Sequence, residues 1–386
     1  MAVTYLTGLE AQHAAIDAIT TVGTAAYSTA QARTGVASLR CNPASAAAGY
    51  CTVLSGPYVH FAIYVATMPT SQVRLICGNN TVGRVSVGLQ ADGSLTVLIG
   101  TNTLVGNSSA GIITTGKWYW FGVRQVTGTS VVFVQVDGAD VVTGTATVTD
   151  TSAWIGVVGT QAGAVDVYID DIVIDDTGFL APSKVALLVP ISDNAVGTGW
   201  TLGTGTAISA NSGSTAVKNT PPLGVADLTA GSDTKQIRNA TANANVSYVA
   251  NLTTYSTAGV GASDTVLALQ PIVATAAPVT TSSKQGTVGV ASNPAITDIA
   301  LGAGGTAGAF WSGLAGGVYP SGWKISTGTL TTSPSVTVGT SPAMRVTQVT
   351  SSNRVAMVCF MGMNVAWTPA VVAGLPDVIT GGGYYS

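Results

Sequence analysis

The stretch VDVYIDDIVIDD, Val165–Asp176, carries five carboxylates in a chain in which only 8% of the residues are charged. Successive side chains of a β-strand point to opposite faces of the sheet, so an apolar face should keep either odd or even numbers. Here one apolar series runs through the odd positions Val165, Val167 and Ile169, and it continues at the even positions Ile172 and Ile174. A one-residue β-bulge at Asp170 and Asp171 explains the change. The stretch therefore predicts a bulged strand in an all-β protein.

The acids of this stretch raise the question of a metal or catalytic centre. Acids divided over the two faces of one strand do not converge on a single cation. At most Asp170 and Asp171 could bind calcium with the help of a residue from a loop. We favour a structural role for these acids, and the sequence predicts no catalytic, cofactor-binding or metal-ligating residues.

The rest of the chain has the same all-β texture. Short runs of Val, Ile, Thr and aromatic residues alternate with Gly, Asn and Ser clusters about every ten residues, as in a sandwich or jelly roll. Two hairpins are predicted at Asp92-Gly93 and Asp137-Gly138, because Asp-Gly tolerates the positive φ angles of tight turns. We expect strands in Tyr58–Pro69 and Gly116–Val126. The aromatic residues of the second, Trp118, Trp120 and Phe121, are expected to fill the core, with a sugar-stacking platform as the alternative.

A change in composition divides the chain. Residues 1–178 form the first predicted domain, and residues 179–386 form a second β-rich domain, expected to be another sandwich. A polar, glycine-rich segment connects them at about residues 193–231.

Composition excludes several classes of protein. The apolar fraction of 46% and the net charge of −3 argue against disorder. Lys and Arg number only 14 and form no basic run, which argues against nucleic acid as a partner. The longest apolar stretch, Val355–Trp367, is interrupted by Asn364 and is short for a membrane span. The N-terminal residues have no basic region and no apolar core, so we expect no signal peptide and synthesis in a cytoplasm.

The four cysteines show no CxxC spacing and no disulfide framework. We expect reduced, mostly buried thiols, although two of the residues could lie on neighbouring strands and pair. The four are Cys41, Cys51, Cys77 and Cys359, of which the first two are the candidate pair.

Six segments occur in an order that resembles a known family. They are YLTGLE (5–10), ARTGVASLR (32–40), FAIYVATMP (61–69), GKWYWFGVRQ (116–125), VQVDG (134–138) and VYIDDIVIDD (167–176). Together they resemble the laminin-G-like, concanavalin-A-like jelly roll near the N-terminus of tailed-bacteriophage virion proteins. The resemblance covers about residues 1–178. It implies a virion part of the tail or tail tip, or of the capsid exterior, and it implies no activity and no set of ligands.

Concanavalin-like folds also include glycoside hydrolases, which need two carboxyl groups flanking the scissile bond. Glu10 is the only glutamate, and the nearest approach to a paired pattern is the acidic stretch already described. The two histidines, His13 and His60, accompany no nucleophile motif, and His60 alternates with apolar neighbours as a core residue does. No phosphate-binding loop is present. We therefore expect no enzymatic activity and no cofactor.

Low charge and a mean hydropathy of +0.44 favour a subunit that is covered by neighbours. Weakly polar surface costs little to desolvate, which suits a homo-oligomer in contact with other virion proteins. We expect a minor tail or tail-tip protein located in the virion, with a capsid decoration or head fibre as the alternative. A module that binds host glycans is the alternative of another class. Its candidate stacking residues are Trp154, Trp200, Trp311 and Trp323.

Overall fold

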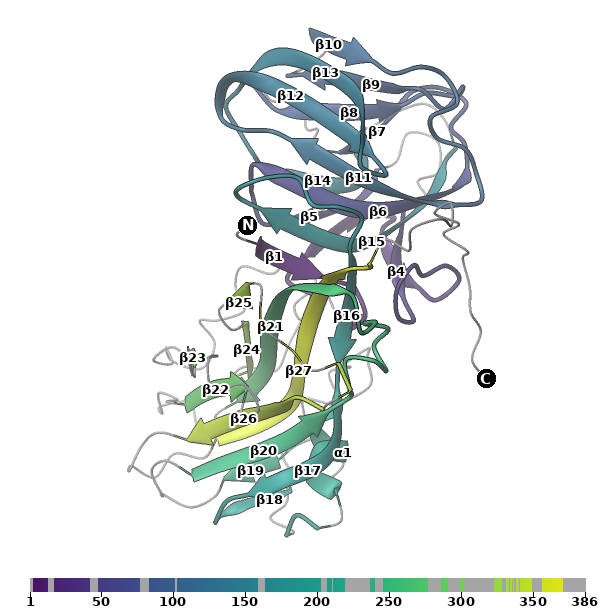
Figure 1. Ribbon diagram of the computed structural model, residues 1–386. Helices are drawn as coiled ribbons and strands as arrows, with labels where there is room; N and C mark the ends of the chain where they lie inside the picture. Colours follow the sequence, from purple (N-terminus) through teal and green to yellow (C-terminus); the bar gives the residue numbers. More distant parts are fainter. Residues whose placement is uncertain are drawn as a thin grey trace. The chain divides into compact units, whose positions relative to one another are not determined.

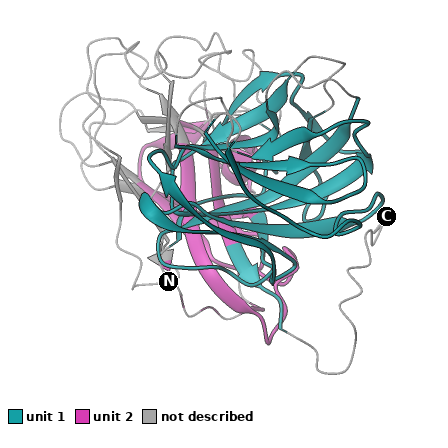
Figure 2. Ribbon diagram, turned by 90° about the horizontal axis from the view of Figure 1, so that it is seen from above, with its two compact units in different colours: residues 1–186, 366–386 teal, residues 187–365 magenta. Residues whose placement is uncertain are grey.

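The computed structural model divides the chain into two compact units, residues 1–186 with 366–386 (unit 1) and residues 187–365 (unit 2) (Figure 2). It describes residues 3–12, 17–41, 48–76, 83–100, 103–158, 164–202, 207–209, 211–218, 237–239, 246–276, 286–290, 299–301, 323–327, 331–332, 334, 336, 338–339, 341–348 and 356–370.

The strands of unit 1 form two antiparallel sheets (Figure 1). They are β1 (Val3–Thr7), β2 (Thr20–Gly23), β3 (Ala26–Ser28), β4 (Ser38–Cys41), β5 (Gly49–Val53), β6 (Tyr58–Thr67), β7 (Val73–Ile76), β8 (Val85–Leu89), β9 (Leu95–Ile99), β10 (Thr103–Asn107), β11 (Trp118–Arg124), β12 (Gly128–Val136), β13 (Ala139–Val148), β14 (Ala153–Val158) and β15 (Asp166–Asp175). The first sheet has the order β13-β12-β11-β6-β15-β4-β3, with β1 also paired to β15. The second has the order β10-β9-β8-β7-β14-β5-β2.

Alternating side chains of the two sheets build one core between them. On the central strand β6, Val59, Phe61, Ile63 and Val65 all belong to this core and are fully buried. The residues between them point to the outer face of the first sheet, as the two-residue period of a strand requires. The all-β class and the sandwich architecture predicted for this part of the chain are confirmed.

The predicted bulge in β15 is also confirmed. The register between β15 and β6 shifts between Asp170 and Val173, and Asp171 has a φ of 49°. Odd-numbered residues before the shift and even-numbered residues after it face the core, for example Ile169 and Ile172. A short acidic side chain tolerates the left-handed backbone that the bulge requires.

The two Asp-Gly sequences form turns of different kinds. Asp137 and Gly138 both have positive φ, 51° and 82°, and connect β12 directly to β13 in a two-residue turn. Between β8 and β9 only Gly93 has positive φ, 78°. This loop is wider, and the backbone N–H of Gln90 donates to the carbonyl of Ser94 across it. Both hairpins are confirmed, and the first has the tight geometry that Asp-Gly favours.

The prediction for the aromatic residues of β11 was partly wrong. Phe121 packs between the sheets, but Trp118 and Trp120 are not part of that core. Alternation places them on the outer face of the first sheet, where each is buried, with 5% and 1% of its surface exposed. The core position beside Phe121 belongs to Tyr119.

The described thiols lie inside the sandwich. Cys41 on β4 and Cys51 on β5 are both buried and free, and they belong to opposite sheets and not to neighbouring strands. Burial raises the pKa of Cys51 to about 12, so this thiol stays protonated and unreactive at neutral pH. Cys77 and the Cys359 side chain lie outside the described residues.

Unit 2 and the segments leading into it add two further antiparallel sheets. One has the order β18-β19-β27-β21-β24, with β16 paired to β27 and β25 to β21, and the other has the order β17-β20-β26-β22-β23. The elements are β16 (Lys184–Leu188), β17 (Pro190–Val196), β18 (Trp200–Leu202), α1 (Ser212–Lys218), β19 (Ile237–Asn239), β20 (Val246–Leu252), β21 (Thr265–Ala276), β22 (Gly286–Val290), β23 (Ile299–Leu301), β24 (Trp323–Thr327), β25 (Thr331–Thr332), β26 (Ala343–Gln348) and β27 (Ala356–Thr368). In the part of the chain that the structure describes, no helix has the length and apolar character of a membrane span.

Candidate functional site

The bulge in β15 directs two neighbouring carboxylates toward the same loop. Oδ2 of Asp170 accepts hydrogen bonds from the backbone N–H of Arg33, at 2.8 Å, and of Thr34, at 3.3 Å. Its Oδ1 accepts the backbone N–H of Asp171 at 2.8 Å. Simple alternation would have separated the two acids, whereas a bulge brings adjacent side chains to one side of the strand.

The second carboxylate forms a buried ion pair. The Arg33 guanidinium lies 2.7 Å from Oδ2 of Asp171, and the two side chains are 4% and 0% exposed. Thr34 Oγ1 donates to the same oxygen at 3.0 Å, and the backbone N–H of Val185 donates to Oδ1 at 2.7 Å. Burial raises the pKa of Asp171, while the charge of Arg33 acts in the opposite direction.

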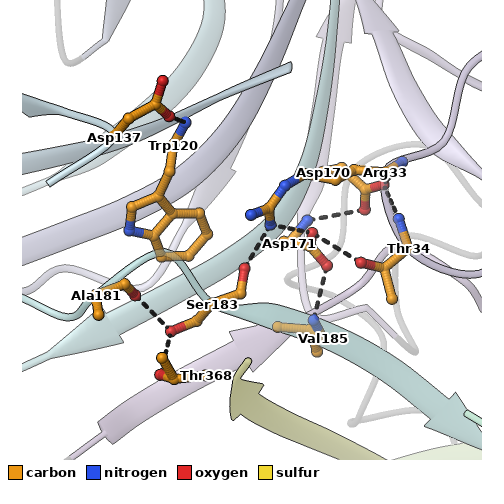
Figure 3. A network of polar contacts seen from close by, with 10 residues as sticks. All are labelled: Arg33, Thr34, Trp120, Asp137, Asp170, Asp171, Ala181, Ser183, Val185 and Thr368. Atoms are coloured by element: carbon orange, nitrogen blue, oxygen red, sulfur yellow. Dashed lines mark hydrogen bonds and ion pairs between the residues drawn. The ribbon is translucent and has the colours of Figure 1, made fainter. Parts of the chain in front are cut away.

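The same arginine extends the network to the segment that leaves the sandwich (Figure 3). It donates to the carbonyl of Ser183 and lies over the Trp120 ring, with 5.2 Å between the guanidinium carbon and the ring centroid. The Ser183 hydroxyl in turn bonds to Ala181 at 2.7 Å and to Thr368 at 3.1 Å. Arg33 therefore connects the bulge to Ser183 and to Trp120 of β11, and Ser183 extends the network to Thr368 of β27.

These contacts give Asp170 and Asp171 of the acidic stretch a structural role. All four carboxylate oxygens of Asp170 and Asp171 already accept hydrogen bonds from the protein. Neither side chain is exposed, so neither can touch a substrate. Among the described residues no group of three or more His, Cys, Asp or Glu side chains is arranged to hold a metal ion. The pair supports the fold of unit 1.

Glu10 is a partly buried acid beside this network. Its Oε2 accepts the backbone N–H of Val36 at 2.7 Å, while Oε1 is buried without a hydrogen-bond partner. Gly35, at φ 65°, provides the space for the Glu10 carboxyl group. A Cβ at this position would lie 2.1 Å from the carboxyl carbon of Glu10. Burial raises the pKa of Glu10 well above 4.5, the Val36 N–H lowers it, and the charge of Asp171 raises it.

The Glu10 environment predicts a pH effect on stability. A folded-state pKa above the unfolded value of 4.5 means that the folded chain binds more protons, so stability falls as pH rises above 4.5. Glu10→Gln keeps an oxygen for Val36 and removes the charge. We expect the variant to equal the wild type near pH 4 and to be more stable at pH 8, with a gap growing by at most about 1.4 kcal/mol per pH unit. Urea unfolding at both pH values measures the gap, and a constant difference would contradict the prediction.

His60 is a buried structural residue, as the sequence indicated. Its Nε2 accepts the backbone N–H of Leu180 at 3.1 Å. The ring stacks on Trp120, with centroids 5.9 Å apart, and meets the edge of Phe179 at 5.8 Å. Burial lowers the pKa of His60 to about 4, although Asp175 acts against this shift. His60 is thus neutral and enclosed, and His13 lies outside the described residues.

The tryptophans proposed for sugar stacking differ in their surroundings. Trp200 is only 3% exposed and therefore unsuited to the role. Trp154 on β14 is partly exposed and stacks on Tyr50 of β5, with ring centroids 5.4 Å apart. Trp311 and the side chain of Trp323 lie outside the described residues.

A second ion pair accompanies Trp154. The Arg84 guanidinium lies 4.9 Å from the centre of its ring and 2.5 Å from a carboxylate oxygen of Asp150. Oδ1 of Asp150 also accepts the hydroxyl and the backbone N–H of Ser152. An aromatic ring beside an arginine–carboxylate pair offers the apolar and polar surfaces that a sugar ring requires.

A groove of about 510 Å³ lies next to this pair, where edge strand β10 of one sheet meets edge strand β13 of the other. The two strands lie side by side at the top of Figure 1. Gly83 and Thr149, the residues directly before Arg84 and Asp150, line the groove. The remaining lining residues are Ile99, Gly100, Thr103, Leu104, Val105, Thr129, Thr145, Ala146 and Thr147.

Sequence reasoning identified Trp154 and missed the groove. The groove depends on two edge strands that are neighbours in space and separated by more than thirty residues in the sequence. The one local signal is the recurrence of threonine at every second residue of β13, at Thr143, Thr145 and Thr147. This pattern marks a polar, uncharged strand face.

Comparison with known proteins gives weak similarities. No protein-family model and no curated protein sequence matches the chain. A carbohydrate-binding module CBM66 from Bacillus subtilis is similar at 9% identity and TM-score 0.29, over 40% of this chain and 92% of that one. Domain 4 of the arabinanase AbnA from Geobacillus stearothermophilus has 13% identity and TM-score 0.30, over 45% and 94%. The binding domain of botulinum neurotoxin DC has 8% identity and TM-score 0.32, over 88% and 93%. Similarities this low assign no function to this chain.

Proposed function

We propose that this chain is a non-catalytic structural component of a bacteriophage virion, a tail or tail-tip subunit that works in a symmetric assembly. The observation behind the proposal is how the few charges of unit 1 are used. Arg33, Arg40 and Arg84 each form an ion pair with an aspartate of the same unit. Charge that is neutralised internally lowers the cost of desolvating the surface against a neighbouring subunit.

Two further observations support a structural role. The acids that suggested catalysis are buried and hydrogen-bonded within the fold. The bulged strand, the tight hairpin and the sandwich all lie within residues 1–178, the part of the chain whose sequence resembles a phage-type jelly roll.

The purified chain should form a defined oligomer. Size-exclusion chromatography with light scattering should give a multiple of the 38.5 kDa chain mass. Because the proposed contacts are uncharged, that mass should stay the same from 0.1 to about 1 M NaCl, whereas ionic contacts weaken with salt. A monomer at high concentration, or an oligomer that dissociates in salt, would contradict the proposed kind of assembly.

A module that binds host-surface glycans is the second candidate. Trp154 and Tyr50 favour it, since their stacked rings are partly exposed beside the pair of Arg84 and Asp150. Aromatic rings bind the apolar faces of sugars, and paired polar groups bind the hydroxyls. Retention of the fluorescently labelled chain on immobilised oligosaccharides is the expected result, and its absence would exclude the second candidate while leaving the first unaffected.

A further inference from the structure

The groove between β10 and β13 is built for an uncharged ligand. Its 510 Å³ falls within the range of small-molecule sites, and none of the described residues that line it is charged. The adjacent Arg84 is neutralised by Asp150 at 2.5 Å. An anionic ligand would find no unpaired cation among the lining residues, and a cationic ligand would find no unpaired carboxylate.

The walls of the groove offer both hydroxyl and apolar groups. Thr103, Thr129, Thr145 and Thr147 are exposed there, and each hydroxyl can donate and accept one or more hydrogen bonds. Leu104 lies among them with 56% of its surface exposed. A sugar ring presents the same combination, with hydroxyls around its edge and C–H groups on its faces.

The backbone keeps the groove open. Gly83 and Gly100 have φ of 86° and 62°, which favour glycine over residues with side chains. A Cβ at Gly83 would lie 1.9 Å from the Thr149 hydroxyl. The hydroxyls of Thr129 and Thr147 are 2.8 Å apart and hold one wall in place across the β12–β13 pair.

We propose that this groove binds a neutral oligosaccharide, with its hydroxyls on the threonines and an apolar sugar face on Leu104. The inference rests on the second proposed function and supplies the site and the ligand class for it. Because Arg84 and Asp150 directly follow two residues of the groove, a chain that continues past its end would reach Trp154 and Tyr50.

Thr145→Arg tests the proposal by placing a bulky cation in the groove at a residue that is exposed. Thr143→Arg is the matched control, because Thr143 is an exposed residue on the same face of β13 and does not line the groove. The probes are immobilised neutral hexasaccharides of glucose, mannose, xylose and arabinose, with hyaluronan and chondroitin sulfate as anionic probes. A synthetic peptide with the sequence of β13, ADVVTGTATV, tests strand addition at the edge. Thermal unfolding of each variant verifies that it is folded.

We expect the wild type and Thr143→Arg to bind at least one neutral hexasaccharide, and Thr145→Arg to bind it at least tenfold more weakly. Equal binding by Thr145→Arg would place the site elsewhere and leave a glycan-binding function standing; loss in Trp154→Ala alone would then assign it to the aromatic pair. Binding only to anionic probes, or only to the peptide, would overturn the ligand class. No binding to any saccharide would overturn the inference together with the second proposed function.

Discussion

Replacing Arg33 with Met should lower the free energy of unfolding of unit 1 by about 3–5 kcal/mol at pH 7, because it leaves the Asp171 carboxylate buried without its cation. Thr34 and Val185 still donate hydrogen bonds to this carboxylate, but neither carries a charge. The loss should be smaller at pH 5 than at pH 8. Without Arg33 the pKa of Asp171 lies higher still. The variant therefore loses the most stability at high pH, where the buried carboxyl group must give up its proton.

Arg40→Met is the matched control for this prediction. Arg40 also pairs with an aspartate, Asp166, and also lies over an aromatic ring, that of Tyr168 at 5.6 Å. Its side chain is 43% exposed, so the loss should stay below about 1 kcal/mol. Hydrogen exchange of β6 and β15 peptides in urea reports unit 1 separately. Equal losses of stability in Arg33→Met and Arg40→Met would show that the buried ion pair stabilises the fold no more than the exposed one.

A double-mutant cycle isolates the ion pair itself. Asp171→Asn keeps the shape of the side chain and tolerates the left-handed backbone at φ 49°. The combined Arg33→Met, Asp171→Asn variant should be more stable than the sum of the single losses predicts, by about 0.5–3 kcal/mol. Additive losses would mean that the two side chains act independently.

Acid should destabilise unit 1 through His60 by about 3 kcal/mol between pH 6.5 and pH 4. Burial lowers the pKa of this imidazole to about 4 from 6.5, so in that window the unfolded chain binds a proton that the folded chain does not. The stability that His60 contributes is therefore complete above pH 6.5 and is lost as pH falls toward 4. The partly buried Glu10 acts in the opposite direction, and the wild-type profile contains both effects.

His60→Gln separates them, because glutamine retains an acceptor for the Leu180 N–H and does not titrate. The variant should be less stable than the wild type at pH 7.5, having lost the ring stacked on Trp120. That deficit should shrink by about 3 kcal/mol by pH 4. His13 is present in both proteins and cancels in the difference. A deficit that does not change with pH would mean that His60 titrates normally in the folded state.

Local patterns predicted those features that depend on neighbouring residues. The change from odd to even apolar positions located the bulge in β15, and Asp137-Gly138 located a tight turn. The parity rule also shows why the placement of Trp120 was wrong. Trp120 and Phe121 are adjacent, so they cannot both face the core of a regular strand.

Contacts between distant segments could not be predicted. Arg33 and Asp171 are 138 residues apart in the sequence, and nothing near either residue indicates the other. Glu10 fits beneath Gly35 only because the loop before β4 passes over the end of β1. The groove likewise requires β10 and β13 to be brought together by two different sheets. Each of these depends on topology, which the amino-acid pattern of a single segment does not determine.

The position of β15 in its sheet has a consequence for biosynthesis. Strand β15 ends at Asp175 and contacts four earlier parts of the chain. They are β6, β4, β1 and the loop that carries Arg33, and none of them can form these contacts before β15 is present. All four leave the ribosome earlier, so the edge of β6 that pairs with β15 stays unpaired in the nascent chain until more than a hundred later residues have been translated. Chaperone demand during translation should peak just before β15 emerges and fall once it has inserted.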